Sequence, residues 1–519
     1  MLVFVITFLL IPQIYYLDRS STKTLMRYLS VALTVLLLLT ACSMSDSSQD
    51  SAATERSSPP NILFILADDL GYGDVGSYNP EAQTATPHID RLAAQGVRFI
   101  DAHASGPWCV PSRYGLITGQ YPIRTTLDWQ KRALIDSSQL TLASMLQRNG
   151  YRTACVGKWH LGFDGVADWS TFASDQRLSG GPVDRGFDSF FGMYASLDIP
   201  PYFYIEGDRP VAPPTDTVAA HQSEGATTSI SGAFWRAGNI APGFEFAEVL
   251  PTFAQRAVQF VESQAQANND QPFFLYLALT APHTPWVPTD AFAGKSSVGE
   301  YGDFVMQTDA VVGQLLEALE TTGQQDNTLV IFASDNGPVW FQEDVEKYNH
   351  RSTAHLRGMK IDEWEGGHRV PFIARWPGQI PAGTVRNDLL GFTDVLATMA
   401  AVVGDSLPEA QILDSHNLLP AFRGDSLKEP IRQELIIGED VVRQNQWKLI
   451  VDGGEGVLSR DYGKKANGAS SESANELYNL EEDPGETNNL YKKMTGKGEE
   501  LAARLYEIQK PSKEQKMLP

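Results

Sequence analysis

The sequence predicts an α/β fold: a doubly wound, mostly parallel sheet flanked by helices, with a smaller C-terminal α+β subdomain. The first observation is a continuous apolar run at 61–67, bounded by Pro60 and a polar residue. A run without apolar-polar alternation is typical of a strand that is covered on both faces in a parallel sheet. The second observation is that similar runs recur at 151–156, 271–279 and 329–333. The third is that helical patterns lie between them, as in a doubly wound domain.

The helices between these strands have recognisable ends. The segment 86–96 begins with Thr-Pro and ends at a glycine, which places a proline at the first helical turn and a stop signal after the last. Thr141 precedes a second helix at 142–148, and Gly150 follows it. A third helix is expected at 304–319, where apolar residues recur at helical spacing. Alternating helices and strands therefore extend over most of the chain.

The chain is expected to divide into a catalytic domain at 61–428 and a C-terminal subdomain with a small antiparallel sheet at 429–519. Within the first, residues 163–250 are rich in Gly, Pro, aromatic and acidic residues and are expected to form long loops on one face. A mobile loop is expected at 453–474. The elements expected in the subdomain are strands at 447–451 and 476–480, a turn at 483–485 and a helix within 497–509.

Charge and cysteine content exclude two classes of protein. The 519 residues include 41 basic and 63 acidic residues, which gives a net charge of −22. General nucleic-acid binding needs a basic surface, so we expect no nucleic-acid partner. An anionic substrate would need a local basic pocket. Only three cysteines occur, Cys42, Cys109 and Cys155, which excludes a disulfide scaffold.

The N-terminus is expected to direct export. Residues 1–41 contain basic residues followed by an apolar run, the layout of a signal segment. The run ends in Leu39-Thr-Ala-Cys42, which resembles the lipobox of bacterial lipoproteins and predicts lipidation of Cys42. Because Asp does not follow the cysteine, we expect an outer-membrane lipoprotein, on the periplasmic or the cell-surface side, with 43–60 as a flexible tether. A transmembrane helix is the alternative, and translation from Met26 instead of Met1 remains open.

Polar residues follow several of the predicted strands. In an open α/β sheet the carboxyl ends of the strands open into one crevice, so these side chains should meet there. Carboxylate and amide oxygens suit a hard cation such as Ca²⁺ or Mg²⁺, and zinc is less favoured. The residues concerned are Asp68 and Asp69 after the first strand, Lys158 and His160 after the second, His283 after the third, and Asp335 and Asn336 after the fourth.

Cys109 lies in the segment Gly106-Pro-Trp-Cys-Val-Pro-Ser-Arg-Tyr-Gly-Leu-Ile-Thr-Gly119. A free cysteine is usually a small buried apolar residue. Here the surrounding Cys-Val-Pro-Ser-Arg resembles the signature of the type I sulfatases, a family of the alkaline phosphatase superfamily. In that family the cysteine is oxidised by a maturation enzyme to formylglycine (3-oxoalanine), and the hydrate of this aldehyde supplies the nucleophilic oxygen.

The resemblance covers the chain from about residue 61 to the end. Three departures are small: His88 stands where the family commonly has Asn, Gln120 where it has Arg, and Met359 where it often has Gly. The segments that resemble family blocks are 61–74, 86–93, 157–162, 185–188, 281–283, 334–337, 357–372 and 476–490.

The resemblance implies a mechanism and a set of site residues. The formylglycine hydrate attacks sulfur, a covalent sulfo-enzyme hemiacetal forms, and sulfate and the aldehyde are then released. One Ca²⁺ would activate the hydrate and neutralise a sulfate oxygen. The implied roles are Asp68, Asp69, Asp335, Asn336 and the Cys109-derived residue as metal ligands, Arg113 to steady them, Lys158 and Lys360 to bind sulfate, His283 to bind substrate and protonate the leaving alcohol, and His160 as the later base.

The implied function is hydrolysis of sulfate esters of a carbohydrate, from a sulfated polysaccharide or its oligosaccharides. The stretches 185–192 and 196–202 look like the corresponding parts of bacterial sulfatases related to N-acetylgalactosamine-sulfate sulfatases. Carrageenan, ulvan and fucan sulfates are the alternative substrates. Expected partners are this glycan, a formylglycine-generating or anaerobic sulfatase-maturating enzyme, and the membrane. Two alternatives remain: a phosphodiesterase or phosphonate monoester hydrolase of the same superfamily, and a non-catalytic surface glycan-binding lipoprotein.

A loop that follows the fourth predicted strand carries His350, Arg351 and His355. Side chains on loops near a site are frequent substrate contacts. Two interpretations are equally good for these three residues, contact with the sugar and a solvated loop.

Overall fold

The computed structural model describes residues 59–166, 177–267, 270–451 and 475–516. Residues 58–519 form one compact unit. The predicted export segment, Cys42 and most of the tether lie outside the described residues, as does the predicted loop at 453–474. Among the helices that are described, none is long and apolar enough to span a membrane.

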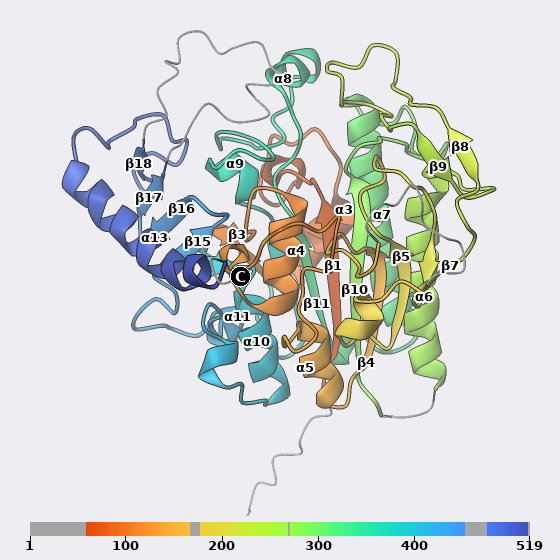
Figure 1. The fold of residues 1–519 in the computed structure, drawn as a ribbon, viewed down its shortest axis with the longest axis horizontal. Helices are drawn as coiled ribbons and strands as arrows, with labels where there is room; N and C mark the ends of the chain where they lie inside the picture. The colour runs from red at the N-terminus through yellow and green to blue at the C-terminus, as the bar shows by residue number, and fades with distance from the viewer. Residues whose placement is uncertain (1–58, 167–176, 268–269, 452–474, 517–519) are drawn as a thin grey trace, which may run out of the picture. The chain divides into compact units, whose positions relative to one another are not determined.

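A large mixed sheet forms the centre of the fold (Figure 1). The four predicted strands are confirmed as β11 (Thr328–Ser334), β1 (Asn61–Asp68), β10 (Phe273–Pro282) and β4 (Arg152–Lys158), which are adjacent and parallel in that order. Almost every residue of these strands is buried. The other strands of the sheet are β5 (Ser189–Met193), β6 (Ile205–Glu206) and β7 (Arg209–Pro210) beyond β4, and β12 (Phe372–Arg375), β2 (Val97–Phe99) and β13 (Thr384–Arg386) beyond β11.

The segment 163–250 differs from the prediction of long loops, because it contributes strands β5, β6 and β7 to the large sheet, and β5 pairs in parallel with β4. It also forms the hairpin of β8 (Asp216–Val218) and β9 (Gly238–Ile240). Strand β12 runs antiparallel to β11, so the sheet is mixed at that side. These strands are short and carry little periodicity, and pairing with a preformed neighbour decides their conformation.

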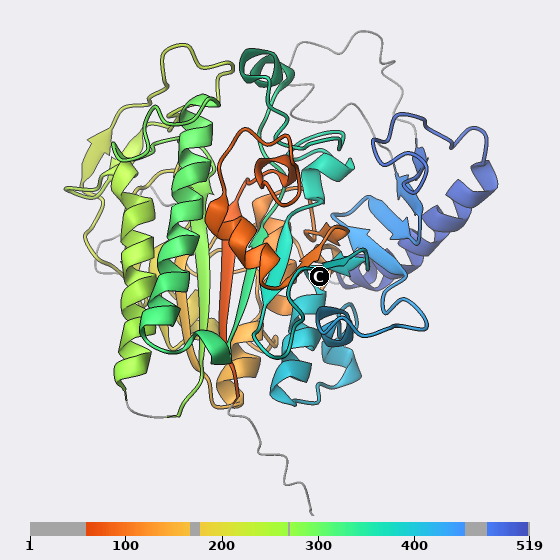
Figure 2. The same cartoon turned by 180° about the vertical axis from the view of Figure 1, so that it is seen from behind.

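Helices cover both faces of the sheet, as the front and back views show (Figures 1 and 2). One face carries α3 (Pro87–Ala94), α6 (Val249–Gln266) and α7 (Gly299–Thr321); the other carries α4 (Cys109–Thr118), α5 (Leu142–Arg148) and α10 (Asp394–Val403). The predicted helices appear as α3, α5 and α7, although α7 begins five residues before position 304. The doubly wound architecture is thereby confirmed.

The C-terminal region forms a second, four-stranded antiparallel sheet. Its strands, in order, are β15 (Glu434–Ile437), β16 (Val441–Gln444), β17 (Trp447–Ile450) and β18 (Glu476–Asn479). The long helix α13 (Thr495–Lys516) packs against β16 and β17. The expected α+β character is confirmed, whereas the boundary at residue 428 stays a prediction.

Glycine is required where β4 approaches β10. Gly157 has φ +116°, and a Cβ there would lie 1.8 Å from the carbonyl oxygen of Ala278.

We expect Gly157→Ala to lower the free energy of unfolding by more than about 3 kcal/mol, because it adds both a backbone clash and left-handed strain. Urea denaturation measures this. Gly150→Ala is the control, with φ +87° and open space around the added atom; it should cost only about 1–2 kcal/mol. Equal losses would contradict the steric explanation.

Candidate active site

The predicted site residues come together at the carboxyl ends of the four adjacent strands. Asp68 ends β1, Lys158 ends β4, His283 follows β10 and Asp335 follows β11. Each is buried. Loops add Cys109, at the start of α4, and Lys360. Side chains that lie far apart in the sequence thus occupy one small region.

Asp68 and Lys158 form a buried ion pair, and neither side chain is exposed. The Lys158 ammonium donates to both carboxylate oxygens, at 2.9 and 2.7 Å. An Arg113 nitrogen lies 3.6 Å from the same carboxylate. Burial alone would raise the pKa of Asp68, but the Lys158 ammonium, with His283, Arg113 and Lys360, holds it well below its usual value. Asp68 is therefore an anion in the folded protein.

Arg113 connects the end of β4 with the segment that follows β11. Its Nε and one terminal nitrogen donate to Asp335 Oδ2 at 3.1 and 2.8 Å, and the other terminal nitrogen donates to the Lys158 carbonyl oxygen at 3.0 Å. The second oxygen of Asp335 accepts the backbone N–H of Asp69 at 3.1 Å. Burial and the neighbouring Asp68 raise the pKa of Asp335 to about 6. An added cation would stabilise the ionised form of this carboxyl group.

Asp69 is the centre of a second set of contacts. Its backbone has φ 63°, and its carboxylate accepts from the Asn336 amide at 2.7 Å and from the Lys360 ammonium at 2.8 Å. His283 Nε2 lies 3.6 Å from the same carboxylate. The amide oxygen of Asn336 is buried and has no hydrogen-bond partner among the described residues. An unpaired buried acceptor is costly, so this oxygen is available to a ligand.

Cys109 is the first residue of α4 and is 2% exposed. Its thiol donates to Asp68 Oδ1 at 3.6 Å. Burial raises the pKa of Cys109 to about 12, although Lys158 and Lys360 act in the opposite direction. At neutral pH the unmodified side chain is a thiol, which is a weak nucleophile.

A metal ion fits this region. Donor atoms of Asp68, Asp69, Cys109 and His283 all lie within 4.8 Å of one another. Carboxylate oxygens and the free Asn336 oxygen form the kind of donor set that hard divalent cations prefer. Three carboxylates, those of Asp68, Asp69 and Asp335, face three cationic side chains, those of Arg113, Lys158 and Lys360. A bound dication would leave this region positive, which suits an anionic substrate.

His160 lies beside the acidic region without contacting the carboxylates. It is 5% exposed, and its two ring nitrogens make no hydrogen bond with any described residue. Burial, with Lys158 and Arg113, lowers its pKa well below the usual value. Its ring meets the Trp129 ring edge-on at 4.3 Å. A neutral imidazole with free nitrogens can accept a proton. Trp129 was not predicted from the sequence, because it lies in a segment without helical or strand periodicity.

His350 contradicts both interpretations from the sequence. It is 1% exposed, and its Nε2 lies 2.7 Å from Asp74 Oδ1. Ser352 and Tyr301 also donate to the Asp74 carboxylate. His350 therefore belongs to a buried hydrogen-bond network that joins its loop to the segment after β1. Arg351 and His355 are exposed.

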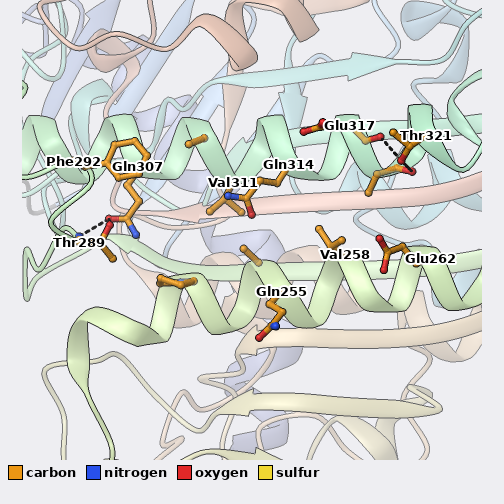
Figure 3. Close-up of a pocket in the computed structure, with 14 residues that line it drawn as sticks. Gln255, Val258, Glu262, Thr289, Phe292, Gln307, Val311, Gln314, Glu317 and Thr321 are labelled. Carbon is orange, nitrogen blue, oxygen red and sulfur yellow. Dashed lines mark hydrogen bonds between the residues drawn. The ribbon is translucent and has the colours of Figure 1, made fainter.

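A groove of about 550 Å³ lies elsewhere, between α6 and α7 (Figure 3). Labelled residues from the two helices, such as Val258 and Val311, face each other across it. None of the residues that line it is a predicted site residue. The cluster at the strand ends is therefore the candidate active site.

Comparison with known proteins identifies the family. A family model described as Sulfatase matches residues 60–405. The N-acetylgalactosamine-6-O-sulfatase of Bacteroides thetaiotaomicron is 32% identical in an alignment of 496 residues, which covers 88% of this chain and 94% of that protein. Human arylsulfatase A is 34% identical over 479 residues, with 87% of each chain covered.

Solved structures agree with this. One from work on glycosaminoglycan metabolism by Bacteroides thetaiotaomicron aligns with a TM-score of 0.75 and 30% identity, over 88% of this chain and 100% of its own. Ps i-CgsB in complex with k-i-k-neocarrahexaose aligns with a TM-score of 0.64 and 26% identity, over 87% and 93%. The acidic cluster and its basic neighbours remain the candidate active site of this sulfuric ester hydrolase, and the chain belongs to the sulfatase family.

Proposed function

We propose that this sulfatase removes sulfate from a sulfated glycan, using Ca²⁺ and a formylglycine made from Cys109. The observation that carries the proposal is the site itself: three carboxylates and a free amide oxygen lie beside Cys109, with three buried cationic side chains around them. The alternatives of a phosphodiesterase and of a non-catalytic glycan-binding lipoprotein become outcomes of the tests below.

The residues that would hold Ca²⁺ are Asp68, Asp69, Asp335, Asn336 and residue 109. The cation would supply positive charge against a sulfate oxygen, which lowers the barrier by electrostatic stabilisation. Arg113 would keep two of these ligands in place, since it bonds Asp335 through two nitrogens and approaches Asp68. The buried, unpaired Asn336 oxygen supports its place in this set.

Residue 109 would supply the nucleophile in its oxidised form. Formylglycine provides, as its hydrate, an oxygen that attacks sulfur. The raised thiol pKa supports the need for modification, because an unmodified Cys109 is protonated at working pH. Its position at the N-terminus of the ten-residue helix α4 also favours an anion there. A formylglycine-generating or anaerobic sulfatase-maturating enzyme would be the partner that modifies it.

The remaining residues would bind the sulfate group and move protons. Lys158 and Lys360 carry ammonium groups within 3 Å of Asp68 and Asp69, where they could reach sulfate oxygens as charge develops. His283 could bind the substrate and donate a proton to the leaving alcohol. His160 could remove the proton in the second half-reaction, because its ring is neutral and its nitrogens are free.

The substrate proposal rests on relatives. The similar Bacteroides protein is named as an N-acetylgalactosamine-6-O-sulfatase, and a similar structure holds a neocarrahexaose. Inorganic sulfate release should be measured on chondroitin, carrageenan, ulvan and fucan oligosaccharides, with Cys109→Ala in parallel. We expect release from chondroitin oligosaccharides that carry 6-sulfated N-acetylgalactosamine. Faster cleavage of aryl phosphodiesters would favour the phosphodiesterase. Binding without turnover in protein shown to hold formylglycine would favour the binding lipoprotein.

Calcium is expected to stabilise the folded protein. A ligand that binds only the folded state at 100 times its Kd adds about 2.7 kcal/mol. Chelation with EGTA should therefore lower the Tm, and Ca²⁺ should restore it. Asp335→Asn should lose most of this response. Asp303→Asn is the control, because Asp303 is a buried aspartate that accepts three loop N–H groups away from the site. The same loss of response in both variants would contradict a calcium site at Asp335.

We also propose the cellular location. The signal segment at 1–41 and the lipobox that ends at Cys42 support an exported bacterial lipoprotein, anchored in the outer membrane through lipid on Cys42. Such a location would bring the enzyme to polysaccharide fragments outside the cytoplasm.

A further inference from the structure

Lys360 is carried by a closed loop, residues 357–366, here called the Lys360 loop. Gly366 N–H donates to the Arg357 carbonyl oxygen at 2.7 Å, which joins the two ends. Within it, the Met359 N–H donates to the Asp362 carboxylate at 3.0 Å. Before α9 (Glu365–His368) begins, the loop contains no helix or strand of its own. Its position therefore depends on what its two ends and its tip contact.

The tip of the loop lies against two parts of the site. The Lys360 N–H donates to the Pro338 carbonyl oxygen at 2.9 Å, in the segment after Asn336. The next N–H, of Ile361, donates to Pro107 at 2.6 Å, two residues before Cys109. The Lys360 ammonium reaches Asp69 from there. A shift of the loop would consequently move the ammonium relative to both Asp69 and residue 109.

One end of the loop is held by the C-terminal sheet through Arg357. Its guanidinium donates to the Tyr478 hydroxyl at 3.1 Å and to the Glu486 carbonyl oxygen at 2.8 Å. It also lies 3.7 Å from the centre of the Trp364 ring. The Trp364 indole N–H in turn donates to Glu476 at 2.8 Å. Both Glu476 and Tyr478 belong to β18.

The other end is held by a buried ionic cluster. Lys448, on β17, has no exposed surface, and its ammonium lies 3.1 Å from Glu365 and 2.8 Å from Glu486. The Glu486 carboxylate also accepts the Glu365 N–H at 2.6 Å. His103 and His368 complete the cluster: their Nδ1 atoms lie 3.0 Å apart, and the Lys448 ammonium lies 3.0 Å from His368 Nε2.

We infer that the pair formed by Lys448 of the C-terminal sheet and Glu486, in the segment after β18, positions Lys360. Glu486 binds both ends of the Lys360 loop, through its carboxylate to Glu365 and through its carbonyl oxygen to Arg357. Burial raises the pKa of Glu486 to about 7, while the Lys448 ammonium, 2.8 Å away, acts in the opposite direction and orients the carboxyl group. The inference depends on the proposed role of Lys360 in binding sulfate. It gives the C-terminal sheet a part in turnover through the position of Lys360.

A double-mutant cycle tests this inference. Glu486→Gln keeps the size of the side chain but leaves a single acceptor oxygen, where the two carboxyl oxygens face the Glu365 N–H and the Lys448 ammonium. It should lower kcat about 10- to 100-fold with little change in KM, because a misplaced Lys360 loses interactions made in the transition state. In a Lys360→Ala background the same substitution should change kcat by less than about twofold. Hydrogen exchange at 357–366 should become faster in Glu486→Gln.

Arg432→Lys is the matched control. Arg432 is a buried residue near the C-terminal sheet that pairs with Asp394, and within the described part of the chain it forms no hydrogen bond or ion pair with the Lys360 loop. It should lower the Tm and leave kcat and the exchange of 357–366 unchanged. If Glu486→Gln does not fold, Arg357→Lys replaces it, since a lysine cannot bond both Tyr478 and Glu486 in the same way.

The outcomes separate the inference from the function on which it depends. If Lys360→Ala alone leaves kcat unchanged, the proposed role of Lys360 is wrong. If Lys360→Ala lowers kcat but the effects of the two substitutions on kcat multiply in the double variant, the C-terminal sheet acts independently of Lys360 and the inference is overturned. If Arg432→Lys lost as much kcat as Glu486→Gln, the loss in Glu486→Gln would be explained by general destabilisation of the protein, and the inference would be overturned.

Discussion

Replacing Cys109 with alanine is expected to lower kcat for sulfate release by at least about 10⁴-fold. Alanine lacks the thiol that would be oxidised to formylglycine, so the variant has no nucleophile. Cys109 stands at the first turn of α4, with its thiol against Asp68. The folded structure should remain, since alanine is a smaller residue that needs no hydrogen bond. Sulfate released from the preferred oligosaccharide, measured by ion chromatography, checks the loss.

Cys155→Ala is the matched control for this result. Cys155 is equally buried, at 1% exposure, but lies within β4. Its substitution should reduce stability slightly and leave kcat within about threefold of the parent protein, because only Cys109 lies in the signature segment. Peptide mass should show formylglycine at position 109 in the parent and in the Cys155 variant. Undiminished turnover by Cys109→Ala would refute the assignment of the nucleophile.

Lys158→Met is expected to have the second largest effect, on both stability and turnover. The ammonium has no exposed surface and contacts both oxygens of Asp68. Methionine has a similar volume but leaves the carboxylate with Arg113 at 3.6 Å as its nearest cation. Removing one partner of a buried ion pair costs about 3–5 kcal/mol. Denaturant unfolding in EGTA should show this loss, and Ca²⁺ should recover part of it by binding Asp68.

The control for this variant is an exposed ion pair. Lys131 lies 3.0 Å from Asp128, and its side chain is 73% exposed. Lys131→Met should change the free energy of unfolding by at most about 1 kcal/mol, because water and salt screen such pairs. Sulfatase activity should be unaffected in this variant and strongly reduced in Lys158→Met. If Lys158→Met retained full activity, Lys158 would not be a sulfate-binding residue.

Much of the fold could be predicted because burial in a parallel sheet leaves a direct pattern in the sequence. β1 is apolar from Ile62 to Ala67 and ends at Asp68, so both its conformation and its end were evident. The short strand β5 was not, because five residues with a glycine do not show a period. Its pairing with β4 supplies the hydrogen bonds that local propensity does not.

The candidate site likewise contains residues that could be predicted from the sequence and residues that could not. Asp68, Lys158, His283 and Asp335 were found by sequence because each stands at the end of an apolar run, and Cys109 because its neighbours form a motif. His350 was misinterpreted, because a histidine in a polar loop has no signal for burial, and only Asp74 beside it reveals a structural role. Trp129 was missed for a similar reason.

The sequence by itself determined the parallel core, the residues at its carboxyl edge and the family, since these depend on local apolar runs and contiguous motifs. The tertiary structure alone decided how the charges pair. Lys158 meets Asp68 across 90 residues and Lys360 meets Asp69 across 291. It also decided that the C-terminal sheet holds the Lys360 loop through Glu486 and Lys448. Ion pairing and burial depend on distance in space, and spacing along the chain carries no record of that distance.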